Sequence, residues 1–98
     1  MDEKAVREHA LAHARAVLGG DLTRASEDLS EPAMAQAPGV MKRLPRPVKA
    51  VAVDSVEVSG EAWTARINYS GDDRVTLVDS RWSDIDGRPQ IVDLHVVD

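Results

Sequence analysis

The sequence predicts an α+β fold in which three N-terminal helices pack on a curved, four-stranded antiparallel meander sheet. Up to Leu44 the apolar residues recur at helical spacing, whereas beyond Pro45 and Pro47 they alternate with a period of two. The alternating runs are joined by short connections, and a parallel crossover would need about a dozen residues or more. Neighbouring strands are therefore expected to be antiparallel.

The first helix is predicted over residues 3–18. The segment is rich in Ala, Leu, Arg and Glu and contains neither Pro nor Gly, a composition that favours a helix. At 100° per residue, one arc gathers the apolar side chains that we expect to face the core, namely Val6, Ala10, Ala14 and Val17. Gly19-Gly20 is expected to end the helix in a left-handed cap.

Two further helices are predicted before the sheet. Asp21 is placed to cap a short helix over residues 22–29, and Ser30 to cap a third one. Pro38-Gly39 is expected to disturb the third helix. Four apolar residues follow its edge: Met34, Val40, Met41 and Leu44.

The four strands are predicted over residues 48–58, 62–70, 74–83 and 89–97. Tight turns are expected at Ser59-Gly60, Gly71-Asp72 and Asp86-Gly87. In the first run, Val51 and Val53 are out of step with Val56 and Val58, which indicates a β-bulge at Asp54-Ser55. A bulge there bends the strand and suits a curved sheet.

Composition excludes several classes of function. The 98 residues open at Met1 without an export signal, so we expect one complete cytoplasmic domain over residues 1–98. No apolar run approaches about 18 residues, so no membrane partner is expected. The chain has no cysteine, and we expect no cofactor. The net charge of -5 lies entirely in residues 48–98, where five Lys/Arg face ten Asp/Glu, and an acidic sheet argues against a nucleic-acid partner.

The order of elements resembles a known superfamily. An Ala-rich helix closes on Gly-Gly-Asp-Leu at residues 19–22, a short helix passes through Asp28-Leu29-Ser30, and a third helix and meandering strands follow. This is similar to a small bacterial member of the nuclear transport factor 2-like, or ketosteroid-isomerase-like (SnoaL-like), superfamily. The resemblance implies a cystatin-like cone that often dimerises through sheet faces and often holds a small apolar ligand. The chain is shorter than that group and lacks its extra strand or hairpin, and no catalytic residue is transferred.

Histidine spacing raises the question of a metal. His9 and His13 are four residues apart and share a helix face, but no HExxH motif surrounds them and a third ligand, such as His95, would be needed. Ordinary helix residues are the favoured interpretation, and no metal is expected.

The aromatic residues suggest a ligand cavity. Trp63, Tyr69 and Trp82 all fall on predicted strands, and with Met34 and Met41 they are predicted to line a cavity for a small apolar molecule. The alternative is that they simply fill the core.

The face of the sheet turned away from the helices is predicted to carry a polar stripe. Arg66, Asp79 and the Asp93/His95 pair fall on one face of neighbouring strands. They form either an acid–base group or a row of cross-strand charge pairs.

The same face suggests a homodimer. If Val78 and Trp82 face the helices, Val75 and Leu77 point outward, and an alternating last strand places Ile91 there too. A two-fold axis brings one self-complementary patch together. The predicted interface residues are Val75, Leu77, Arg81, Ile91, Asp93 and His95.

The leading interpretation is a non-catalytic cone-type domain that self-associates and holds a small apolar molecule. The first alternative is a small isomerase or cyclase that works by proton transfer, for which a cavity with a carboxylic acid beside a polar donor would argue. The second alternative is a domain that captures another protein on its sheet face.

Overall fold

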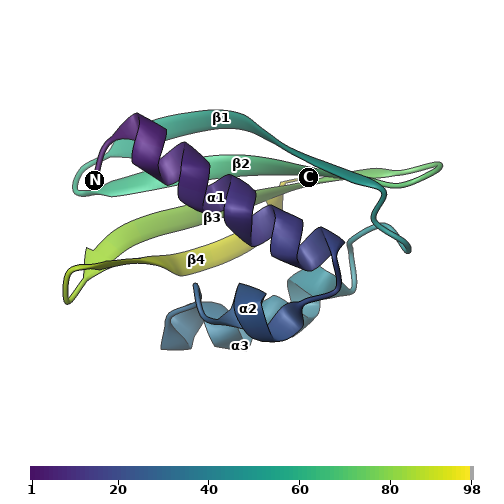
Figure 1. Ribbon diagram of the computed structural model, residues 1–98, viewed down its shortest axis with the longest axis horizontal. Coiled ribbons are helices and arrows are strands. Elements are labelled where there is room, and N and C mark those ends of the chain that lie inside the picture. The colour runs from purple at the N-terminus through teal and green to yellow at the C-terminus, as the bar shows by residue number, and fades with distance from the viewer. Residues whose placement is uncertain (98) are drawn as a thin grey trace.

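The computed structural model describes residues 1–97 and confirms the α+β prediction (Figure 1). The helices are α1 (Glu3–Leu18), α2 (Leu22–Ser26) and α3 (Glu31–Met41). The strands are β1 (Ala50–Ser59), β2 (Ala62–Ser70), β3 (Val75–Ile85) and β4 (Arg88–Val97). They form one antiparallel sheet in the order β1-β2-β3-β4, as expected for a meander.

Local sequence sets most of the helix ends. Asp21 accepts a hydrogen bond from the Arg24 amide at 3.1 Å and caps α2 as predicted. Gly20 adopts a φ of 76°, the left-handed conformation predicted after α1. Ser30 stands at the N-cap of α3, but its hydroxyl makes no capping hydrogen bond, so that part of the prediction is wrong.

Two helix boundaries differ from the prediction. α2 ends at Ser26 because the next residues pair with β4: the Ile91 amide donates to the Asp28 carbonyl at 2.7 Å, and the Ser30 amide donates to the Ile91 carbonyl at 2.9 Å. α3 continues through Pro38, which removes one backbone donor but still accepts from the Lys42 amide at 3.2 Å. Pairing with β4 therefore shortens α2. In α3, the hydrogen bond from Lys42 keeps the helix continuous past Pro38.

The sheet contains two bulges, of which one was predicted. The register shifts between Val53 and Ser55, confirming the bulge in the first strand. A second shift lies opposite Arg81 and Trp82, which pair with Asp93 and Ile91 respectively. The extra residue between these partners reverses the alternation, so Ile91 is fully buried and does not point outward as expected.

The core lies between the helices and one face of the sheet, which we call the inner face. α1 packs across β1 and β2, while α3 lies against β4 (Figure 1). The largest fully buried side chains are those of Trp82, Ile67, Ile91, Val6 and Val78. Within residues 1–97, no helix has the combination of length and hydrophobicity that crossing a bilayer requires.

Candidate functional site

A cavity of about 270 Å³ opens between the three helices and the inner face, and we call it the inner pocket. Its walls come from α1, α2, α3 and the segments around them, with one residue from each of β2, β3 and β4. Most lining side chains are aliphatic or Met. The polar exceptions are His13, Ser26 and Tyr69.

The structure brings together three of the five predicted ligand-binding residues. Met34, Met41 and Tyr69 line the inner pocket. Trp82 lies outside it, fully buried in the core, where its indole nitrogen donates to Ser80 Oγ at 3.0 Å. Trp63 is half-buried, packs against the core and also lies outside the pocket.

His13 reaches the inner pocket from the buried side of α1. It shares that side with Val6, Ala10 and Ala14, and it is itself buried. Its Nδ1 lies 3.1 Å from Asp28 Oδ2, and its ring meets Trp82 edge-on with 6.3 Å between centroids. These contacts fix the plane of the imidazole.

Asp28 binds the Nδ1 side of that imidazole. Its backbone is fastened to β4 through Ile91, and its Oδ2 also accepts from Arg24 Nη1 at 3.0 Å. Burial alone would raise the pKa of Asp28, but the hydrogen bonds and charges of His13 and Arg24 outweigh it and lower the pKa below its ordinary value. Asp28 is therefore an ionised carboxylate at neutral pH.

The ionised carboxylate sets the tautomer of His13. A carboxylate only accepts hydrogen bonds, so the proton between the two groups belongs to Nδ1. In the neutral imidazole Nε2 then carries a lone pair, and no residue within 1–97 bonds to it. The one fully buried side-chain polar atom lacking a partner in that range is Ser30 Oγ, so Nε2 has access to open space. His13 lines the inner pocket, and we take the pocket to be the space that Nε2 reaches.

Tyr69 contributes the second polar group. Burial raises the pKa of Tyr69, so the phenol keeps its proton at physiological pH. Its hydroxyl makes no hydrogen bond to residues 1–97 and is not fully buried, and the residue lines the pocket. The pocket therefore offers a hydrogen-bond acceptor on α1 and a hydroxyl on β2.

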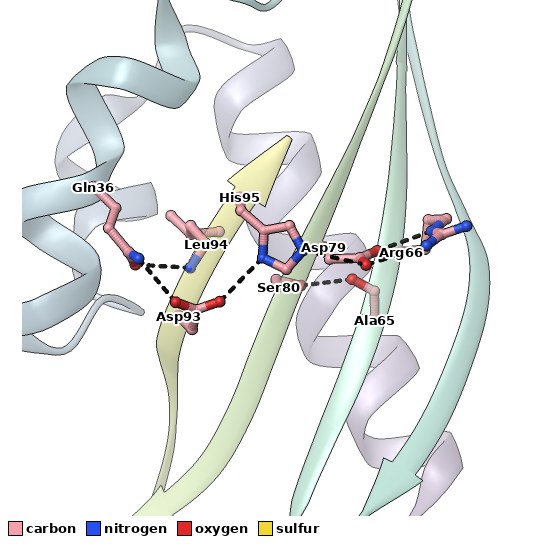
Figure 2. A network of polar contacts seen from close by, with 8 residues as sticks. All are labelled: Gln36, Ala65, Arg66, Asp79, Ser80, Asp93, Leu94 and His95. Carbon is pink, nitrogen blue, oxygen red and sulfur yellow. Dashed lines mark hydrogen bonds and ion pairs between the residues drawn. The ribbon is translucent and has the colours of Figure 1, made fainter. Parts of the chain in front are cut away.

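The predicted polar stripe is present on the sheet face turned away from the helices, which we call the outer face (Figure 2). Arg66 binds Asp79 with two hydrogen bonds of 2.9 and 3.2 Å, and His95 Nε2 lies 3.6 Å from the same carboxylate. Asp93 approaches His95 Nδ1 at 3.1 Å and accepts from Gln36 Nε2 at 2.8 Å.

Electrostatics identify this stripe as a set of cross-strand pairs. The hydrogen bond and charge of Asp79 raise the pKa of Arg66. The hydrogen bond from Gln36 lowers the pKa of Asp93 against a smaller opposing effect of burial, and His95 lowers it further. Asp93 is thus held in its charged form, and Asp79 is hydrogen-bonded to Arg66, which favours the charge-pair interpretation of the stripe over an acid–base group.

The three histidines are not brought together. His13 faces the inner pocket, whereas His95 lies on the outer face, half-exposed between two carboxylates. Among residues 1–97 no group of three His, Asp or Glu side chains is arranged to hold a metal ion.

Of the six residues predicted for the dimer interface, five lie on the outer face and one lies in the core. Val75 is 59% exposed and points outward, together with Leu77, Arg81, Asp93 and His95. Ile91 belongs to the core.

Comparison with models of known families, with curated proteins and with solved structures gives no significant match. The chain's own geometry is therefore the basis of the functional argument.

Sequence reasoning did not single out Asp28 as a site residue. His13 and Asp28 are 15 positions apart, on separate elements, and no periodicity links them. The usable signal was a histidine on the apolar side of a helix, since a buried imidazole needs a polar partner. That partner had to come from another element, and three carboxylates lie between Gly20 and Ser30.

Proposed function

We propose that the protein binds a small, mainly apolar molecule in the inner pocket. The observation that carries this proposal is a cavity of about 270 Å³ whose walls are almost entirely aliphatic. A dry apolar cavity of about 150 Å³ already accommodates benzene, and ligand pockets begin near 300 Å³. The expected ligand is therefore a molecule of one or two rings.

We further propose that the chain is a small member of the nuclear transport factor 2-like superfamily. The order of its elements and an apolar pocket between helices and sheet support this assignment. An isomerase or cyclase in this pocket stays a prediction, for which His13 would be the proton acceptor.

The pocket proposal is tested with p-cymene, a hydrocarbon of one substituted ring. Met34 and Met41 line the pocket, whereas Met1 lies outside it, so ¹³C-labelled methionine methyls report binding directly. We expect the Met34 and Met41 signals to shift saturably on titration while the Met1 signal stays in place. If neither pocket methyl moves at saturating p-cymene, the proposal is wrong.

A matched pair of variants on α3 shows where the probe binds. Ala37 lines the pocket, and Ala37→Phe places a ring in it; Ala35 is exposed on the same helix, and Ala35→Phe leaves the pocket open. We expect p-cymene affinity to fall at least tenfold in Ala37→Phe and to change less than twofold in Ala35→Phe. Equal effects would place the probe elsewhere.

A further inference from the structure

The inner pocket contains few polar groups, and they differ in availability. Ser26 Oγ already donates to the Thr23 carbonyl at 2.8 Å. His13 Nε2 and the Tyr69 hydroxyl make no hydrogen bond to residues 1–97. An apolar ligand that carried no polar atom would leave both groups unsatisfied, and an unpaired buried polar group costs free energy.

We infer that the inner pocket selects molecules that carry one hydroxyl group, of the phenol or alcohol class, with the O–H donating to Nε2 of His13. This inference rests on the proposed function, because it specifies the ligand of the same pocket. Three features of the site carry it: the Asp28 carboxylate on Nδ1, the free Nε2, and the aliphatic walls around them.

The geometry favours a hydroxyl over other polar groups. Nε2 of the neutral imidazole is an acceptor, so a carbonyl or carboxylate oxygen would face a lone pair. An ammonium group would donate, but its charge would lose hydration among aliphatic walls at a high free-energy cost. A hydroxyl is a small, neutral donor, and it leaves the rest of the ligand free to be apolar.

The test compares thymol with its methyl ether at mildly alkaline pH. Both probes share the substituted ring, and only thymol has an O–H. We expect the wild-type protein to bind thymol about 3- to 10-fold more tightly, the range that one net hydrogen bond supplies. The added methyl group makes the ether the more apolar probe, so burial of apolar surface alone would favour the ether.

The variant Asp28→Asn tests the role of the tautomer. An amide can donate to Nδ1, which moves the imidazole proton to Nε2 and removes the acceptor. We expect the preference for thymol to disappear, because Nε2–H can donate to the oxygen of either probe. Saturable binding of the ether by this variant would show that the pocket is intact. Tyr69→Phe is the control: it removes the other free hydroxyl and should retain the preference.

A measurement on the wild-type protein covers the case in which Asp28→Asn does not fold. The ¹⁵N spectrum of the His13 ring should show a protonated Nδ1 and an unprotonated Nε2, and the Nε2 signal should move with thymol but not with the ether. A proton found on Nε2 would overturn the inference.

The outcomes separate the two proposals. If both probes bind equally, the hydroxyl inference is wrong while the pocket stands. If Tyr69→Phe loses the preference and Asp28→Asn keeps it, recognition belongs to Tyr69 and the inference is again wrong. If neither probe binds the wild-type protein, the proposed function fails, and the inference fails with it.

Discussion

Ser80 is a small residue that completes the hydrogen bonding of the largest side chain in the core. Its hydroxyl accepts from the Trp82 indole at 3.0 Å and donates to the Ala65 carbonyl at 2.9 Å. Ser80 and Trp82 are both fully buried on the inner face. These two hydrogen bonds give the buried indole N–H of Trp82 a partner, and a buried donor without a partner would cost free energy.

We therefore predict that Ser80→Ala lowers the free energy of unfolding by about 1–3 kcal/mol, because the indole donor loses its partner in the core. The measurement is urea unfolding at neutral pH. Ser83→Ala is the matched control on the same strand: Ser83 is half-buried and its side chain makes no hydrogen bond to residues 1–97, so its effect should stay within about 0.5 kcal/mol. Similar values for the two variants would contradict the role given to Ser80.

At the scale of single residues, periodicity predicted which side chains face inward but not which partners they meet. It placed Tyr69, Val78 and Trp82 on one face correctly, since alternation along a strand is a local property. It missed the contact of His13 with Asp28, because that contact depends on how a turn docks against β4.

At the scale of elements, one amide side chain of α3, that of Gln36, makes two hydrogen bonds to β4. Gln36 donates to Asp93 at 2.8 Å and accepts from the Leu94 backbone amide at 2.9 Å (Figure 2). Residues 28–30 pair with the same strand at Ile91. α3 and the preceding turn thus satisfy backbone groups on the free edge of β4.

We predict that Gln36→Leu lowers the free energy of unfolding by about 1–2 kcal/mol, since it removes one bond to a backbone amide and one to a carboxylate. Hydrogen exchange of the Leu94 amide should accelerate more than that of its neighbours on β4. Gln90→Leu supplies the control, because Gln90 is half-buried on β4 and its side chain bonds to no residue within 1–97. Unchanged Leu94 exchange in Gln36→Leu would rule out this account of the edge.

The elements themselves were largely predictable, and the exceptions share a cause. Capping residues, turn dipeptides and the change of period act within a few residues, so they located all seven elements. The early end of α2 and the bulge opposite Trp82 arise from pairing with β4 and from the fit of Ile91 into the core. Such tertiary effects leave no local pattern to read.

At the scale of the whole molecule, the outer face remains the expected surface for self-association. Val75 is exposed, and Leu77 pairs directly with Val97, so an aliphatic patch lies at one end of this face. Asp79 and Asp93 already have partners within the chain. Apolar burial, and not exchange of charge, therefore carries the proposed homodimer.

We predict that light scattering during gel filtration at micromolar concentration gives twice the 10.6 kDa chain mass. Val75→Glu should return the monomer, because a charge on the patch opposes its burial. Val58→Glu is a closely matched control, since Val58 is also 59% exposed but pairs with Trp63 on the opposite side of the sheet. A monomeric wild type, or a dimer that only Val58→Glu dissociates, would refute the proposed interface.

The covered edge of β4 has a consequence for growth by strand addition. On β1, the opposite end of the sheet, the side-chain contact to the edge within residues 1–97 is a single hydrogen bond from Arg7 to the Val53 carbonyl. A fibril extends only if each unit offers one edge to the unit before it and another to the unit after it. This chain leaves one edge accessible, so a β1-to-β1 encounter would consume both free edges and stop. We therefore expect the turn at residues 28–30 to oppose growth of the sheet by strand addition at β4.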